Sequence, residues 1–185
     1  LMSITGGMNA GSLFGGIGND SFDLTGGQAT GLVDTGSGVD SVLLGSLADS
    51  ITLTGVLTST SLDAGGGDDS IIIKANMSSA SIEAGAGSDT LNFLPSSVSI
   101  LGTTIKGGAG ADNISLYGAN DVVFDTASGD SIFGGTGADT LLFTGSVLNS
   151  SIQAGSGADS IVMAGTGMTG NTIDLGLGTD TIKFT

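Results

Sequence analysis

Residues 107–142 read GGAGADNIS LYGANDVVF DTASGDSIF GGTGADTLL when the chain is divided into blocks of nine. Each block has an aspartate in its sixth place, at Asp112, Asp121, Asp130 and Asp139, and a large apolar residue two places later. Nine residues are enough for one tight turn and one short strand. The repetition therefore predicts a stack of turn–strand units.

The same pattern recurs along most of the chain, from about residue 15 to residue 182. The motif Gly-x-Gly-x-Asp occurs eight times, with its aspartates at Asp20, Asp40, Asp69, Asp89, Asp112, Asp139, Asp159 and Asp180. Three weaker copies keep the aspartate but lose the second glycine, and their aspartates are Asp49, Asp121 and Asp130. One such motif is typical of an ordinary turn, whereas eight copies indicate a repeat architecture.

The net charge of the chain narrows the classes of partner that it could bind. The sequence has 18 Asp plus Glu against 3 Lys plus Arg, a formal net charge of −15, and neither His nor Cys. This balance disfavours nucleic acid and anionic membranes and favours cations. Apolar residues make up 39% of the chain, enough to drive burial, so the composition is not that of a disordered acidic tail. No apolar run approaches the roughly 18 residues of a membrane span, so we expect no membrane insertion.

The block GGTGADTLL at residues 134–142 is similar to the nonapeptide G-G-x-G-x-D-x-U-x, in which U is a large apolar residue. The chain thus resembles the hemolysin-type calcium-binding repeats (repeats-in-toxin, RTX). This resemblance implies a right-handed parallel β-roll with Ca²⁺ ions between adjacent turns. The first glycine is replaced elsewhere, and we expect little effect because that position offers a backbone carbonyl. The replacements are Thr35, Ala64, Ala84, Ala154 and Leu175.

The resemblance also implies a set of calcium ligands. Its carboxylates would come from Asp20, Asp40, Asp49, Asp69, Asp89, Asp112, Asp121, Asp130, Asp139, Asp159 and Asp180. Its backbone carbonyls would come from Gly16, Gly18, Gly36, Gly38, Gly65, Gly67, Gly85, Gly87, Gly108, Gly110, Gly135, Gly137, Gly155, Gly157, Gly176 and Gly178. One ion between each pair of neighbouring turns gives about five to eight Ca²⁺ ions.

The spacing of the aspartates predicts the architecture without the resemblance. From Asp20 to Asp180 the steps are 20, 9, 20, 20, 23, 9, 9, 9, 20 and 21 residues. A step of nine suits one strand with one turn, and a step of about twenty suits a full coil with two of each. We predict an all-β, parallel β-solenoid of two stacked sheets and about nine coils. It would form a single domain over residues 1–185, cut from a longer protein.

Alternating apolar residues predict the buried face of each sheet. The first sheet is expected to bury Leu13, Val33, Ile51, Ile71, Leu91, Ile114, Ile132, Ile152 and Ile173. The second is expected to bury Phe22, Val42, Leu62, Ile82, Ile105, Val123, Leu141, Ile161 and Ile182.

Stacked coils would place successive aspartates about 4.8 Å apart. Two carboxylates at that distance repel by about 1 kcal/mol in water and roughly 3 to 4 kcal/mol at an effective dielectric constant of about 20. Ca²⁺ removes the conflict because it binds about six to eight oxygens, and glycine lets a turn adopt positive φ and point its carbonyls inward. The alternative for any single copy is an aspartate that only caps its own turn.

Because each step of nine residues crosses to the other edge, the spacing predicts two ladders of ions, one on each edge. One edge would carry Asp20 and Asp40, followed later by Asp121, Asp139, Asp159 and Asp180. The other edge would carry Asp49, Asp69, Asp89, Asp112 and Asp130.

The outward side chains suggest where partners would bind. Phe124, Leu142 and Val162 are predicted to form an apolar stripe on the second sheet, for lateral self-association or contact with other surface proteins. The outward file of the first sheet is irregular, which argues against a carbohydrate- or ice-binding face. That file is Phe14, Asp34, Thr52, Ile72, Asn92, Ser115, Phe133, Gln153 and Asp174.

These features predict a calcium-binding structural module of a secreted or cell-surface bacterial protein, of surface-layer or adhesin type. It would fold on meeting extracellular Ca²⁺. Two alternatives stay open: a carbohydrate- or ice-binding solenoid module, and a non-catalytic secretion or folding module of an exported enzyme or toxin. We do not expect an enzyme, because the chain has no His, Cys or Arg and no carboxylate pair outside the ladder placed for acid–base work.

Overall fold

The computed structural model describes residues 3–94, 100–116, 131–144, 147–165 and 168–185. These residues form β-strands joined by turns, which confirms the all-β prediction. The described ranges include no helix that could cross a membrane.

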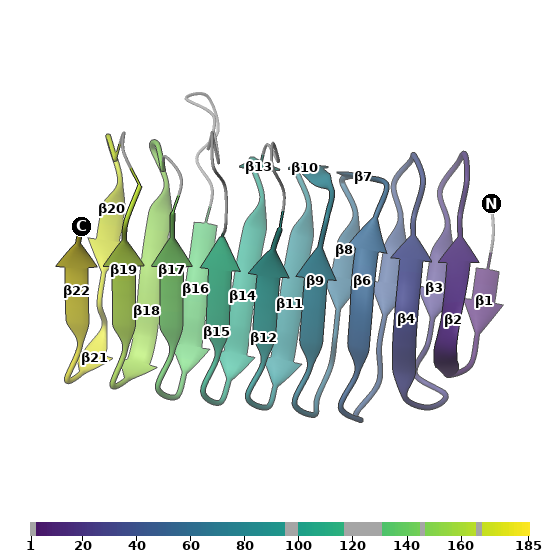
Figure 1. Ribbon diagram of the computed structural model, residues 1–185, viewed down its shortest axis with the longest axis horizontal. Coiled ribbons are helices and arrows are strands. Elements are labelled where there is room, and N and C mark those ends of the chain that lie inside the picture. Colours follow the sequence, from purple (N-terminus) through teal and green to yellow (C-terminus); the bar gives the residue numbers. More distant parts are fainter. Residues whose placement is uncertain (1–2, 95–99, 117–130, 145–146, 166–167) are drawn as a thin grey trace.

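Two long parallel sheets run the length of the molecule, one in front of the other in Figure 1. The front sheet contains β2 (Met8–Phe14), β4 (Ala29–Asp34), β6 (Ser50–Thr54), β9 (Ser70–Ile73), β12 (Thr90–Phe93), β15 (Asn113–Leu116), β17 (Thr140–Phe143), β19 (Ser160–Met163) and β22 (Thr181–Phe184). The rear sheet contains β1 (Ser3–Thr5), β3 (Ser21–Asp23), β5 (Ser41–Leu43), β8 (Ser61–Asp63), β11 (Ser81–Ala86), β14 (Thr104–Ala109), β16 (Ser131–Thr136), β18 (Ser151–Gly157) and β20 (Thr172–Asp174), with β21 (Leu177–Gly178) paired to β18.

The chain alternates between the two sheets, so each coil has two edges (Figure 1). We call the edge where the chain passes from the rear to the front sheet the lower edge, and the opposite one the upper edge. A short third sheet lies on the upper edge and consists of β7 (Val56–Thr58), β10 (Asn76–Ser78) and β13 (Ile100–Leu101). Its buried Leu57, Met77 and Ile100 are in register and close the upper end of the core.

The core lies between the two main sheets because every second side chain of each strand points inward. In the front sheet Ile51, Ile71 and Leu91 stack in register, and in the rear sheet Val42, Leu62 and Ile82 do the same. All six are at most 2% exposed. Branched apolar residues suit such a pleated, buried surface, so the alternation determines which face is packed.

The predicted order of the coils is wrong beyond Ile114. Ile114 pairs with Leu141, and Ile105 pairs with Ile132, so one coil of 27 residues leads from Asp112 to Asp139 in place of three steps of nine. As a result Ile132, Ile152 and Ile173 belong to the rear sheet, while Leu141, Ile161 and Ile182 belong to the front sheet. Val123 lies outside the described residues.

In this coil a complete turn stacks on another complete turn, and a Cβ on Gly137 would overlap the carbonyl oxygen of Gly110, so this position needs glycine. The turn that ends at Asp139 has both glycines, and so does the turn that ends at Asp112. Counting every weak copy as a crossing would have placed these two turns on opposite edges. A smaller shift occurs near the amino-terminal end, where Val33 pairs with Leu53 and not with Ile51.

The predicted apolar stripe is only partly supported. Leu142 and Val162 are direct neighbours on strands β17 and β19, but these belong to the front sheet and not to the sheet of Ile105. Both side chains are half-buried, and Phe124 lies outside the described residues. Ser115 and Lys183 flank the pair in register, so in the described part the stripe is two residues long.

We expect the two neighbouring isoleucines of β9 to differ sharply in their contribution to stability. Ile71 is fully buried, whereas Ile72 points outward and is half-buried. Ile71→Ala should lower the free energy of unfolding by about 3 kcal/mol because it leaves a cavity, and Ile72→Ala by well under half of that. Urea unfolding followed by circular dichroism measures both. Equal losses would contradict the assignment of the buried face.

Candidate metal site

The Gly-x-Gly-x-Asp turns of both edges share one backbone form. In residues 134–139, Gly135 and Gly137 have φ values of +127° and +128°, and the turn ends at a buried aspartate, Asp139. All sixteen glycines expected to provide carbonyls have positive φ, between +81° and +152°. This confirms the predicted conformation, which L-residues with a Cβ rarely adopt.

The stacking of the coils is a second reason why these positions need glycine. A Cβ on Gly157 would overlap the carbonyl oxygen of Gly137, and a Cβ on Gly137 would overlap that of Gly110. The glycine carbonyls thus point along the solenoid axis toward the same glycine of the next coil. Some of them also accept a hydrogen bond from that coil, as Gly65 O does from the Ala86 amide at 3.0 Å.

The aspartates of the lower edge form a hydrogen-bonded ladder. Oδ1 of each carboxylate accepts a hydrogen bond from the backbone N–H of the aspartate one coil earlier, at 2.8–3.0 Å. The ladder runs through Asp49, Asp69, Asp89, Asp112, Asp139, Asp159 and Asp180. Its first member, Asp49, accepts the Ala29 amide in the same way at 2.6 Å.

The second carboxylate oxygen has a different environment. Oδ2 is buried and has no hydrogen-bond partner in Asp40, Asp69, Asp89, Asp112, Asp139 and Asp159. These residues are only 1–2% exposed. Asp49 is an exception, because its Oδ2 accepts a long hydrogen bond of 3.4 Å from the Gly45 amide. An unpaired buried acceptor is costly, so its repetition at six positions requires an explanation.

Burial and charge together shift the titration of the ladder. Burial raises the pKa of Asp69 to about 7 and that of Asp112 to about 6, against a usual value of 3.8. The hydrogen bond from the preceding coil lowers the pKa of both, and the neighbouring ladder carboxylates raise it further. Burial also raises the pKa of Asp89 and Asp139. The ladder therefore resists full ionisation near neutral pH unless positive charge is supplied.

In its described part, the upper edge contains one aspartate pair, and uncharged residues follow at the equivalent position. Asp20 N–H donates to Asp40 Oδ1 at 2.9 Å, as in the ladder. In later coils, where this position directly before the rear strand is described, it is occupied by Thr60, Ala80, Thr103, Ser150 and Asn171; before β16 it is Asp130, outside the described residues. Asn171 Oδ1 accepts the Ser150 amide at 3.0 Å and so reproduces the ladder bond without a charge.

The predicted division of the aspartates between the edges is partly wrong. Asp20 and Asp40 do lie on the edge opposite Asp49, Asp69, Asp89 and Asp112, as expected. Asp139, Asp159 and Asp180 instead continue the ladder of Asp112 on the lower edge. Asp121 and Asp130 lie outside the described residues. The described aspartates thus form six neighbouring pairs on the lower edge and one on the upper edge.

The chemistry of the ladder fits a hard cation that accepts backbone ligands. In the described ranges no three acidic side chains converge on one point. A gap between two coils therefore offers at most two carboxylates, and further ligands would have to be turn carbonyls. Ca²⁺ accepts this mixture of oxygens.

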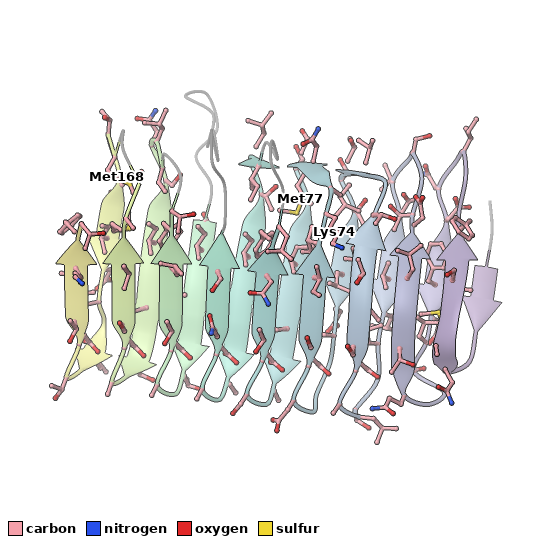
Figure 2. All side chains as sticks on the ribbon, in the orientation of Figure 1. Lys74, Met77 and Met168 are labelled. Carbon is pink, nitrogen blue, oxygen red and sulfur yellow. The ribbon has the colours of Figure 1, made fainter. Side chains whose placement is uncertain are left out.

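The lysines do not supply the missing charge. Lys106 pairs with Glu83 at 3.4 Å on the outer face of the rear sheet. Lys74 lies toward the upper edge in Figure 2, as do Met77 and Met168. Lys183 lies outside the core on β22, beside Val162. The ladder carboxylates are thus left to one another and to the turn backbone.

Some polar residues that organise the turns carry little signal in the sequence. Asp34 Oδ1 and Asp174 Oδ1 accept the amides of Gly36 and Gly176 and so cap the turns that follow their strands. Asp68 Oδ1 accepts the Ser88 amide from the next coil at 2.8 Å. The repeated Asp-x-Gly at residues 34–36 and 174–176 is the one feature from which such caps could be anticipated.

Comparison with known proteins identifies no relative. No family model, no curated protein and no solved structure matches the chain.

We expect the metal-free protein to become more stable as the pH falls. The folded ladder binds protons that the unfolded chain has already released above about pH 4, because the pKa values of Asp69 and Asp112 are raised on folding. Stability should therefore be highest below about pH 4 and fall as the pH rises through 6 to 7. Urea midpoints of metal-stripped protein at about pH 5 and about pH 8 test this. A higher midpoint at the alkaline value would contradict it.

Proposed function

We propose that this chain is a calcium-binding structural module of RTX type, from a secreted or surface-exposed bacterial protein, whose folding depends on extracellular Ca²⁺. The observation that supports it best is the row of buried Oδ2 atoms without partners in successive coils. A cation between two coils would pair with these oxygens and relieve the repulsion along the ladder. The gain is large because a buried, unpaired carboxylate is among the most costly groups in a protein interior.

The ligand types favour calcium over other metals. The chain has no His and no Cys, so imidazole and thiolate ligands for zinc or copper are absent from the sequence. Mg²⁺ prefers a rigid octahedron and keeps several of its waters, whereas Ca²⁺ takes about six to eight oxygens in flexible geometry. Carboxylates of neighbouring ladder aspartates, with carbonyls of the Gly-x-Gly turns, match the second description.

Calcium would occupy the seven gaps between paired aspartates. Its chemistry there is electrostatic: it neutralises the ladder and ties adjacent coils together. Because such an ion binds the folded chain and not the unfolded one, it stabilises the fold by mass action. Extracellular calcium modules bind at about 10⁻⁴ to 10⁻³ M, which supports folding outside the cell.

The upper edge supports a role for the aspartates beyond closing the turn. Thr60, Ala80 and Thr103 occupy the aspartate position there, and the coils still stack in register. Coil closure by itself therefore does not require a carboxylate. Seven consecutive carboxylates on the lower edge then need another reason, and binding a cation supplies one.

A conservative substitution separates calcium binding from simple capping. Asp89→Asn keeps an Oδ1 acceptor for the Asp69 amide, as Asn171 does for Ser150, but removes the charge. We expect the variant to be more stable than the wild type without metal and to bind Ca²⁺ about tenfold more weakly in its gaps. Circular dichroism during calcium titration, together with urea unfolding in chelator, measures both effects.

Asp63→Asn is the matched control, because Asp63 is exposed on the outer face of β8 and should change neither property. If the aspartates only cap their turns, the calcium response of Asp89→Asn will equal that of this control. A wild type whose β structure and urea midpoint in excess chelator are both unchanged by added calcium would overturn the proposal.

A second function, binding of a carbohydrate or an ice surface, is favoured by one observation. Directly after the aspartate position, the rear sheet has an outward file of hydroxyl residues that stays in register across eight strands: Ser21, Ser41, Ser61, Ser81, Thr104, Ser131, Ser151 and Thr172. This file is regular, whereas the outward file two residues further along each strand is irregular. It presents hydroxyls at the spacing of β-strands, about 4.8 Å.

Replacement of Ser41, Ser61 and Ser81 by lysine tests this second function. All three are exposed, so the fold and the calcium response should stay unchanged. If the file binds a surface, the variant will lose adsorption to insoluble polysaccharide or inhibition of ice recrystallisation that the calcium-loaded wild type shows. If the wild type shows neither activity, the second function is wrong and only the structural role remains.

A further inference from the structure

The residue five places before each ladder aspartate, here called the head residue, lies at the start of the turn and faces its interior. It is Gly107 for Asp112 and Gly134 for Asp139. Three other ladder turns have alanine there, with the methyl group fully buried, and these head residues are Ala64, Ala84 and Ala154. The ladder thus contains turns that differ by a single methyl group at an inward position.

Two oxygens from neighbouring coils converge on the space next to each glycine head. A Cβ on Gly134 would lie 2.7 Å from Asp139 Oδ2 and even closer to the carbonyl oxygen of Ala154. A Cβ on Gly107 would lie 2.5 Å from Asp112 Oδ2 and even closer to the carbonyl oxygen of Gly134. Both Oδ2 atoms are buried and have no hydrogen-bond partner.

These paired oxygens cannot satisfy one another. A carboxylate and a carbonyl are both acceptors, so their approach needs a cation or a proton donor between them. The same convergence occurs on the upper edge at Gly15, with Asp20 Oδ2 and the Thr35 carbonyl. Its recurrence on both edges indicates a property of glycine-headed turns in general.

An alanine head cannot keep this arrangement. Cβ atoms essentially never approach other heavy atoms closer than 3.0 Å, so the methyl group forces the two oxygens apart. Backbone conformation does not explain the choice of residue, because neither Gly107 nor Gly134 has positive φ. The head residue therefore determines how close the oxygens of a gap lie to one another before a cation binds.

We propose that the head residue divides the ladder into two classes of cation site, and that the gaps Asp112–Asp139 and Asp139–Asp159 bind Ca²⁺ most tightly. This inference rests on the proposed calcium function. In these two gaps an unpaired carboxylate oxygen and a carbonyl oxygen are already gathered, which reduces the cost of assembling the ligand shell. The gaps after Asp69, Asp89 and Asp159, whose head residues are alanine, fill at higher calcium concentration, as does the gap after Asp49, whose head residue is Leu44. The first glycine of the repeat, which was expected to be interchangeable, thus determines the calcium affinity of each site.

A reciprocal exchange between two stacked turns tests the proposal. Gly135 pairs with Gly155, so head residues 134 and 154 occupy equivalent positions in neighbouring coils. Gly134→Ala should weaken the gap Asp139–Asp159 about tenfold, and Ala154→Gly should tighten the gap Asp159–Asp180 by a similar factor. Calorimetric titration of the whole chain with CaCl₂ counts the sites in each class. The expected result is one tight site fewer in the first variant and one more in the second, with the wild-type numbers restored in the double variant.

Because the two substitutions are opposite, the test separates a change in calcium affinity from misfolding. Circular dichroism at saturating calcium detects a site that Gly134→Ala loses through general damage to the fold. A tight site gained by Ala154→Gly has no such origin. Wild-type class numbers in Ala154→Gly would overturn the two-class proposal while leaving calcium binding intact. A wild type that takes up no calcium would instead overturn the proposed function, and this inference with it.

Discussion

The hydrogen bond that each ladder aspartate accepts from the backbone of the preceding coil is the interaction on which the rest of the structure depends. It holds the carboxylate inside the turn, so Oδ1 is satisfied while Oδ2 is buried without a partner. Parallel strand pairing holds the coils at one distance, and at that distance only glycine fits where the carbonyl of Gly137 meets Gly157. The inward isoleucines then stack in the same register. Turn, ladder and core are therefore three consequences of one spacing.

That spacing creates an electrostatic problem which the polypeptide alone does not solve. Burial and neighbouring carboxylates raise the pKa of Asp69 and Asp112, and no lysine faces the ladder among the described residues. The upper edge offers a comparison within the same molecule. There, uncharged residues such as Thr60 and Asn171 occupy the equivalent position, and the small sheet of β7, β10 and β13 closes the core with apolar side chains. The two edges thus represent two ways of closing a coil, one apolar and self-sufficient, the other acidic and suited to a cation.

The sequence predicted the local structure well because a local cause is sufficient for it. Positive φ at all sixteen glycines follows from the Gly-x-Gly-x-Asp motif, and the inward position of Ile71 and Ile82 follows from alternation. The crossing between Asp40 and Asp49 was also correct, since nine residues cannot complete a coil. The interchangeability expected for the first glycine stays a prediction, but only stacking reveals that a Cβ on Gly134 would meet both Asp139 Oδ2 and the carbonyl oxygen of Ala154 in the next coil.

By itself, the sequence determined the repeat, the turn conformation, the buried faces and the acidic edge, because each is specified within about twenty residues. Only the tertiary structure decided which coils are neighbours. Asp121 and Asp130 continue the period of nine, yet the backbone of Asp112 donates a hydrogen bond to Asp139, and only glycine fits where Gly137 meets the carbonyl of Gly110. Of the repeat aspartates that the structure describes, this placed seven on one edge and two on the other. The period of the sequence describes residues that are close together along the chain. The ladder, in contrast, depends on contacts between turns that are a whole coil apart in the sequence.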